Sequence, residues 1–313
     1  MISLSRLILL GAAVINFCFA SQPKIEALDF ADPSIILDPK TSHLFAFALK
    51  GNGKNVQALT GIDGQWLPLP DVDILPVPGM WVNATHPNIR APDVHYIQQT
   101  DTYILYYTAL HTDSPYYCVG IATASKVTGP FTAFHHPFAC PLEDGGAIDA
   151  SGFYDEEFRS RWVVYKVDGN SKGLGGPCGN GDTPGFETPI VMQRVSSADG
   201  ITPFGKPIPI LLRDPDIDGE FAVYVLFYSS HCRSQPEYDV RYATAKHVLG
   251  PYTRQSQLIG AANASKNNFT APGGATAVMD VWGTMVFHAN CGAGRCMHQA
   301  DFAVDGGKVK LQG

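Results

Sequence analysis

The chain has 313 residues, 45% of them hydrophobic, and a formal net charge of −7 at pH 7. Such a chain can bury a sizeable core as one large domain or two smaller ones. The acidic balance, without any run of basic residues, argues against nucleic acids and anionic membranes as partners.

The first segment, residues 1–20, has Arg6 ahead of a short apolar run and small residues before Ser21. This pattern is typical of a secretory signal peptide cleaved near Ala20. The alternative is a membrane anchor, for which the apolar run is short. We therefore expect a secreted, extracellular protein whose mature chain, residues 21–313, forms a single domain.

The mature chain consists of short apolar and aromatic runs separated by Gly, Pro, Asn and Asp, with almost no helical periodicity. In chain order, the expected strands include SIILDP from Ser34, HLFAFAL from His43, DTYILYYTAL from Asp101, RWVVYKV from Arg161, AVYVLFYSS from Ala222 and GTMVFHA from Gly283. β-branched and aromatic residues between turn residues indicate an all-β chain. Many evenly spaced strands favour a sandwich, a barrel or a propeller.

A duplicated unit decides among these folds. IATASKVTGPFT begins at Ile121 and YATAKHVLGPYT begins at Tyr242, which is 242 − 121 = 121 residues later. If one diverged copy lies between them, the period is about 60 residues, and the mature chain holds close to five units. We therefore predict a five-bladed β-propeller with four strands in each blade.

Three aspartates follow the same period. Asp32 in ADPS, Asp93 in APDV and Asp149 in IDAS succeed one another at intervals of about 60 residues, the length expected of one blade. Equivalent positions of successive blades face one another around the axis, so these carboxyl groups are expected to meet there. Crowded carboxylates raise one another's pKa, and a pair of acids in different protonation states is what glycosidic cleavage requires.

Four stretches resemble glycoside hydrolase family 43: DFADPSII, RAPDVHYI, AIDASGFYDE and YVLFYSSHCRSQPEYDVRYATAKHVLGPYT. The resemblance runs from about Leu28 to Ala300 and implies a five-bladed propeller that hydrolyses arabinose- or xylose-containing plant cell-wall polysaccharides with inversion. A five-bladed glycosidase family with another sugar preference is the neighbouring alternative. By resemblance, Asp32 is the general base, Asp149 tunes and orients the general acid, and Asp93 shapes the sugar subsite. The alternative for Asp93 is a turn aspartate that binds local amides.

The expected general acid is Glu220 in GEFAVY. In the family it belongs to a Glu-Gly/Ala-Pro motif, and a strand and a turn separate it from the strand that corresponds to YVLFYSS. Here only three residues lie between Glu220 and Tyr224, so about ten residues are missing. Glu187 is the nearby substitute. The gap suggests an incomplete gene model or a degenerate copy, and the alternative function is a catalytically impaired, carbohydrate-binding propeller.

Other substrate-binding residues are expected from the first and fifth blades. Phe30 and Trp81 would offer apolar faces to a sugar ring, although most aromatic residues of such a chain belong to the core. His288 would line the pocket, or else be a hydrogen-bonded core histidine. Arg295 would contact the sugar or the base carboxylate, or else be an exposed loop arginine. Several family members carry a Gly-His pair at the start of the fifth blade, where the histidine helps to hold an axial metal ion or water cluster. Because Gly273–Gly274 stands there, we expect no cofactor and no metal.

Six cysteines remain after Cys18 leaves with the signal peptide, and they suggest three disulfides in an oxidising compartment. The favoured bridges are Cys291–Cys296 and Cys118–Cys140, which leaves Cys178 with Cys232. A zinc site is the alternative, but the chain has no CxxC pair. Three Asn-x-Ser/Thr triplets, at Asn83, Asn263 and Asn268, are glycosylation candidates. We expect a monomer whose partner is a plant cell-wall polysaccharide or oligosaccharide.

Overall fold

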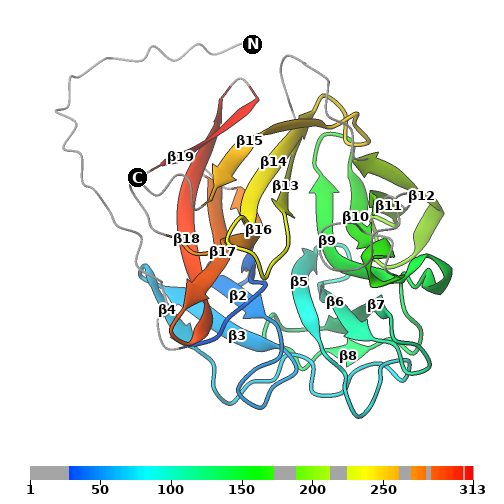
Figure 1. Ribbon diagram of the computed structural model, residues 1–313. Helices are drawn as coiled ribbons and strands as arrows, with labels where there is room; N and C mark the ends of the chain where they lie inside the picture. Colours follow the sequence, from blue (N-terminus) through cyan, green and yellow to red (C-terminus); the bar gives the residue numbers. More distant parts are fainter. Residues whose placement is uncertain are drawn as a thin grey trace, which may run out of the picture.

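Five antiparallel sheets follow one another along the chain and stand as blades around a common axis (Figure 1). The computed structural model describes residues 28–172, 188–211, 224–260, 269–279, 283–305 and 307–312. The predicted five-bladed β-propeller is confirmed. The expected signal peptide, residues 1–20, lies outside the described residues.

Each of the first three blades has four strands, and within each sheet consecutive strands of the chain are neighbours. The strands of blade 1 are β1 (Ser34–Leu37), β2 (Leu44–Ala48), β3 (Gln57–Ile62) and β4 (Gln65–Pro68). Those of blade 2 are β5 (Arg90–Ile97), β6 (Thr102–Leu110), β7 (Tyr117–Ala124) and β8 (Thr132–Ala133). Those of blade 3 are β9 (Ala147–Asp155), β10 (Ser160–Val167), β11 (Ile190–Val195) and β12 (Pro203–Leu211).

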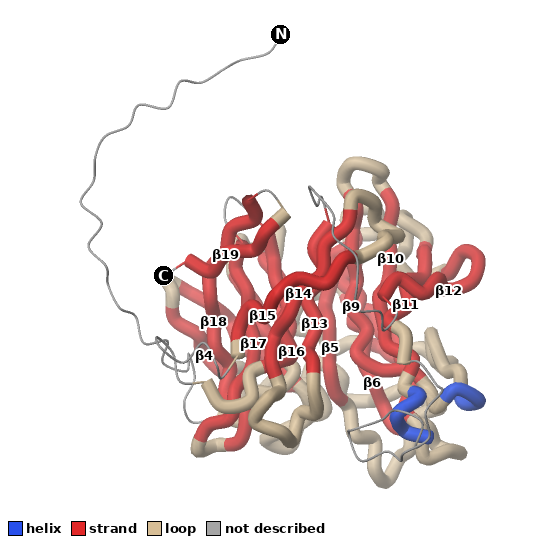
Figure 2. The backbone as a smooth tube through the Cα atoms, turned by 45° about the horizontal axis from the view of Figure 1, so that its top comes forward, coloured by secondary structure: helices blue, strands red, loops and turns tan. Residues whose placement is uncertain are grey.

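The last two blades differ in their described strands. Those of blade 4 are β13 (Tyr224–Ser230), β14 (Asp239–Ala245) and β15 (Thr253–Ile259). Those of blade 5 are β16 (Gly273–Met279), β17 (Gly283–Cys291), β18 (Gly294–Asp305) and β19 (Lys308–Gln312). Two short 3-10 helices, Leu142–Asp144 and Gly169–Lys172, lie together at one edge of a molecule that is otherwise strand and loop (Figure 2).

The duplicated unit corresponds to β6–β8 in blade 2 and β13–β15 in blade 4, with blade 3 between them. This confirms that a diverged copy separates the two similar stretches. In both units, a cis Gly–Pro bond precedes the outermost strand, at Gly129–Pro130 and Gly250–Pro251.

The fourth blade is incomplete within the described residues. β13 corresponds to β6, which is buried along nearly its whole length, but only Tyr224 of β13 is buried. β6 is covered by β5 on one side and β7 on the other, whereas among the described strands β13 pairs only with β14. No described strand therefore fills the innermost position of blade 4. Residues 212–223, which precede β13 and include Glu220, lie outside the described residues.

Each of the five interfaces between neighbouring blades contains its own apolar cluster. The cluster between blades 1 and 2 is the largest, with Phe47 and Tyr107 fully buried at its centre. The one between blades 3 and 4 is the smallest, and its buried members are Trp162, Met192 and Ile210. Because each fully buried large apolar side chain contributes about 1.5–3 kcal/mol, the described residues stabilise the interface between blades 3 and 4 the least.

Two of the expected disulfides, Cys118–Cys140 and Cys291–Cys296, are present. Cys232 is also disulfide-bonded, and its expected partner Cys178 lies outside the described residues. Of the three glycosylation candidates, Asn83 is partly exposed in a loop, where its Oδ1 accepts from the backbone N–H groups of Thr85 and His86. The other two, Asn263 and Asn268, lie outside the described residues.

Candidate active site

The innermost strands of four blades share an unusual backbone conformation near their first residues. Asp32, Ala91, Asp149 and Gly274 have positive φ angles of 50°, 44°, 59° and 59°. The pairing register is interrupted at the last three of these positions, as a β-bulge requires. β1 contacts both β5 and β16, and β5 contacts β9, so the four strands lie side by side around the axis (Figure 1).

These four residues are therefore equivalent positions of blades 1, 2, 3 and 5. Ala91 lies about 60 residues after Asp32 and about 60 residues before Asp149, which is the length of one blade in each direction. Asp93, which the sequence spacing groups with the two other aspartates, lies two residues further along β5. The structure thus places two carboxyl groups, rather than three, at the repeated position.

Asp32 and Asp149 influence each other's ionisation. Burial raises the pKa of Asp149 to about 6, and the negative charge of Asp32 contributes to the same shift. Protein atoms crowd the Asp149 carboxyl group, although the residue also keeps access to solvent. Burial is the largest cause of the raised pKa at both residues, and the charge of Asp32 adds to it at Asp149. Such a pair holds a proton on one carboxyl group while the other is ionised.

Three guanidinium groups oppose this effect at Asp32. Burial raises the pKa of Asp32, and Arg295 is the strongest of the positive charges that lower it. The other two are Arg90 and Arg233. Arg90 also lowers the pKa of Asp149, and its guanidinium lies 3.8 Å from the centre of the Tyr117 ring. The positive charges favour the ionised form of Asp32, which is the form that a general base needs.

Neighbouring blades hold the two aspartates in place. The backbone N–H of Asp149 donates to Oγ1 of Thr108, a fully buried residue of β6, at 3.0 Å. The backbone N–H of Asp32 faces Nδ1 of His288 on β17 at 3.0 Å. Each carboxyl-bearing residue is thus fixed by a side chain from an adjacent blade.

His288 contacts the backbone of Asp32 from within the protein core, and its own side chain is not exposed to solvent. Its side chain is fully buried, and burial lowers the pKa of its ring to about 3, so the imidazole is neutral. Nε2 of His288 lies 3.1 Å from Nη1 of Arg295. An arginine only donates, so Nε2 accepts from it only in the tautomer whose proton is on Nδ1, and Nδ1 lies 3.6 Å from the Asp32 carboxylate. The opposite tautomer accepts the Asp32 N–H instead, and the neutral ring satisfies one arrangement at a time.

Arg295 joins the fifth blade to the beginning of the first. Its Nη2 donates to the carbonyl oxygen of Arg233 at 3.1 Å, and its backbone N–H donates to Oδ1 of Asp29 at 3.0 Å. Its guanidinium also lies 5.9 Å from the centre of the Tyr238 ring, which stacks on His288. Arg295 therefore acts on Asp32 through its charge and through His288.

The carboxylate of Asp93 forms a hydrogen bond with the neighbouring blade. Only 6% of its side chain is exposed, and its Oδ2 accepts from the backbone N–H of Gly152 on β9 at 2.9 Å. The same oxygen lies 2.7 Å from Nε2 of His95. The carboxylate thus accepts from a backbone N–H of the next blade. The alternative considered from the sequence was an aspartate that binds local amides in a turn.

Replacement of Asp93 by alanine is expected to lower the free energy of unfolding by about 1–3 kcal/mol, because the N–H of Gly152 loses its acceptor. The kcat of the folded variant should remain near that of the wild type. Urea denaturation and steady-state kinetics measure the two quantities. Asp93→Asn, which keeps an acceptor oxygen, is the control. A large loss of kcat/KM at unchanged stability would instead assign Asp93 to a sugar subsite.

Two expected sugar-stacking aromatics are core residues. Phe30 has no exposed surface and packs in the cluster between blades 5 and 1. Trp81 is 6% exposed and stacks on Tyr107. Neither ring has a face free for a sugar, which corrects the expectation for both. Glu220 and Glu187 lie outside the described residues.

The described residues at the start of β16 do not fit a metal ion. Gly274 offers no side-chain donor, and a Cβ at this position would lie 2.7 Å from Cε1 of His288. The nitrogens of His288 already face Asp32 and Arg295. Across the described ranges, no group of three or more His, Cys, Asp or Glu side chains is arranged to hold a metal.

The comparisons with known proteins identify the family of this chain. The family model of glycosyl hydrolases family 43 matches residues 72–300. The chain therefore belongs to this family of glycosidases; the match begins after Asp32. No curated protein sequence matches significantly. Within the described residues, no helix is long and apolar enough to cross a membrane.

Solved structures share the fold at low sequence identity. A thermostable family-43 glycoside hydrolase superimposes with a TM-score of 0.71 at 17% identity, over 91% of this chain and 93% of that one. An endo-arabinase from Bacteroides thetaiotaomicron has a TM-score of 0.66 at 18% identity, over 92% and 99%. An endo-1,4-beta-xylanase from the same organism has a TM-score of 0.62 at 19% identity, over 94% and 97%.

Proposed function

We propose that this chain is a secreted, inverting glycoside hydrolase that cleaves arabinose- or xylose-containing plant cell-wall polysaccharide. The observation that carries the proposal is the placing of Asp32 and Asp149 at equivalent blade positions, with a raised pKa at both. Relatives in fold that are described as an endo-arabinase and an endo-1,4-beta-xylanase support the choice of pentose polymers.

In the proposed reaction, Asp32 takes a proton from water as the water attacks the anomeric carbon. Glu220 donates a proton to the leaving oxygen, and Asp149 orients this acid and keeps its pKa raised. The stereochemistry predicts that the acid and the base are roughly 6.5–9.5 Å apart, which leaves room for the water. The guanidinium groups near Asp32 favour its ionised, basic form.

One observation favours a second candidate, a propeller that binds carbohydrate without cleaving it. The described part of blade 4 has no strand at the innermost position, and the expected acid belongs to that position. Without a proton donor, the site would keep the two aspartates and lose most of its rate, because general acid catalysis contributes about 10²- to 10⁴-fold.

The leaving group distinguishes the two candidates. The wild type is expected to hydrolyse nitrophenyl glycosides of arabinofuranose or xylose and the corresponding unactivated disaccharides, with NMR showing an inverted anomeric product. Glu220→Gln should lose about 10²- to 10⁴-fold in kcat on the disaccharide and much less on the nitrophenyl glycoside, whose leaving group needs little protonation. Glu143→Gln, a change at an exposed residue, is the control.

Equal turnover of the disaccharide by wild type and Glu220→Gln would remove Glu220 from the mechanism. Saturable binding of the sugars by the wild type without any turnover would favour the carbohydrate-binding propeller. A product that retains its anomeric configuration would exclude inversion.

A further inference from the structure

A pocket lies between blades 3 and 4, away from the paired aspartates. Its volume is about 380 Å³, within the range of about 300–1,000 Å³ typical of small-molecule sites. Phe158 reaches it from the turn between β9 and β10, and Ser160 from the start of β10. Asp149 and Asp155 are six residues apart on β9, so at about 3.3 Å per residue the pocket is roughly 20 Å from the candidate active site.

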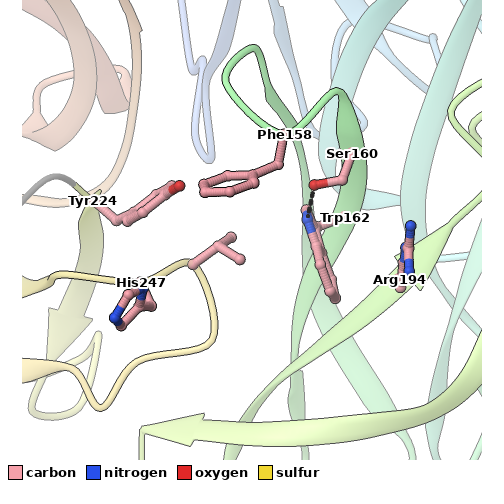
Figure 3. A pocket seen from close by; sticks show the side chains of 7 residues that line it. Phe158, Ser160, Trp162, Arg194, Tyr224 and His247 are labelled. Atoms are coloured by element: carbon pink, nitrogen blue, oxygen red, sulfur yellow. Dashed lines mark hydrogen bonds between the residues drawn. The ribbon is translucent and has the colours of Figure 1, made fainter.

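Hydrogen bonds hold two aromatic side chains of the pocket wall in place. The hydroxyl group of Tyr224 donates to Oδ2 of Asp155 at 2.8 Å. The indole N–H of Trp162 donates to Oγ of Ser160 at 2.8 Å, as the dashed line in Figure 3 shows. Both aromatic residues are 8% exposed, so their rings are positioned before any ligand binds.

The chemistry of the lining is aromatic and cationic. The ring of Phe158 is 64% exposed and lies between Tyr224 and Trp162 in the view of Figure 3. The guanidinium of Arg194 lies 6.0 Å from the Trp162 ring and has no ion-pair partner in the part of the chain that the structure describes. His247 contributes a second polar group from blade 4. No described residue of the lining is acidic, and the carboxylates of Asp155 and Glu157 lie close enough to act on Tyr224.

This lining complements a ring that has an apolar face and carries a carboxylate. Sugar rings place C–H groups on an aromatic face, and arginine binds carboxylates through two parallel hydrogen bonds. A neutral sugar has no charged group that could pair with the guanidinium of Arg194. Because the whole chain has a net charge of −7, an acidic polymer is repelled in general and needs a local cationic site.

We propose that this pocket binds a uronic acid residue of a plant polysaccharide, with the carboxylate on Arg194 and the sugar ring against Phe158. The choice of a polysaccharide ligand rests on the proposed function. A second site on the same polymer raises its effective concentration at the catalytic end of the molecule. The pocket would therefore favour acidic, uronate-bearing chains over neutral ones.

Calorimetric titration of the full chain tests the proposal. The two probes are a xylo-oligosaccharide that carries one glucuronic acid and the same oligosaccharide without it. The wild type is expected to bind the acidic probe more tightly, with an affinity that falls as salt increases. Arg194→Gln should weaken binding of the acidic probe about tenfold and leave the neutral probe unchanged, whereas Lys308→Gln, which removes an exposed charge from blade 5, should change neither.

Phe158→Ala should weaken binding of the acidic probe severalfold, and Phe134→Ala, at a 40% exposed phenylalanine of another blade, should not. Circular dichroism confirms that each variant is folded. Equal affinity for the two probes, equal losses in Arg194→Gln and Lys308→Gln, or the absence of saturable binding would each overturn the proposal.

Hydrolysis of a nitrophenyl glycoside by the same preparations separates this proposal from the proposed function. Hydrolysis without uronate binding would overturn the pocket assignment and leave the enzyme assignment intact. Binding that depends on Arg194, in a protein without hydrolysis, would support the pocket and remove the enzymatic function.

Discussion

Asp32→Asn is expected to lower kcat by about 10²- to 10⁴-fold, with a much smaller change in KM, because the variant cannot take a proton from the attacking water. Asparagine has nearly the same shape and tolerates the left-handed backbone conformation found at Asp32. The backbone N–H that faces His288 is also retained. The loss should therefore reflect chemistry rather than unfolding, and steady-state kinetics on disaccharide substrates measures it.

Asp63→Asn is the matched control for this experiment. Asp63 has the same positive φ of 50°, is exposed in the turn between β3 and β4, and lies on the strand pair at the outside of blade 1. The variant Asp63→Asn should leave kcat unchanged. If Asp32→Asn keeps wild-type kcat, or loses no more than Asp63→Asn does, Asp32 is not the base.

Asp149→Asn is expected to lower kcat/KM about 10- to 100-fold, less than a change of the base itself, because Asp149 acts through the protonation of its neighbours. The variant should also shift the acid limb of the pH–rate profile to lower pH. In the wild type, Asp149 is the last of the two carboxyl groups to ionise, because burial and the charge of Asp32 raise its pKa to about 6. In the variant only Asp32 ionises, and the step near pH 6 is gone.

The same substitution has an expected effect on stability with a defined sign. The folded-state pKa of Asp149 is raised from 3.8 to about 6, so ionising this group costs free energy only in the folded state. The cost is absent below about pH 4 and complete above about pH 6. Relative to the wild type, Asp149→Asn should therefore gain stability as pH rises through this window, by a small amount because solvent reaches the side chain. Urea midpoints across the window measure the gain.

An acid limb that stays in place in Asp149→Asn would show that the ionisation of Asp149 does not set this limb. A wild-type rate together with an unmoved pH profile would remove Asp149 from the site. A lower rate with an unmoved profile would leave it only an orienting role.

Local features of the sequence predicted the architecture. The alternation of apolar and aromatic runs with turn residues indicated strands, because it depends only on which residues suit a pleated, half-buried surface. The duplicated unit at Ile121 and Tyr242 indicated five blades, since a repeat preserves one packing solution. Short-range bridges such as Cys291–Cys296 were also predictable, because their partners are close along the chain.

The composition of the site depended on packing that no local pattern encodes. Spacing grouped Asp93 with Asp32 and Asp149, but the bulge places Ala91 at the equivalent position and leaves Asp93 between blades. Phe30 has the residue type of a sugar platform, and ring closure buries it.

The sequence by itself therefore determined the class of fold, the number of blades and the two aspartates near the start of innermost strands. Only the tertiary structure decided that His288 and Arg295 support Asp32, and that Phe158, Arg194 and Tyr224 surround one pocket. The physical reason is that strand formation and repeats follow from neighbouring residues, whereas charge, burial and pocket shape arise where distant segments pack against one another.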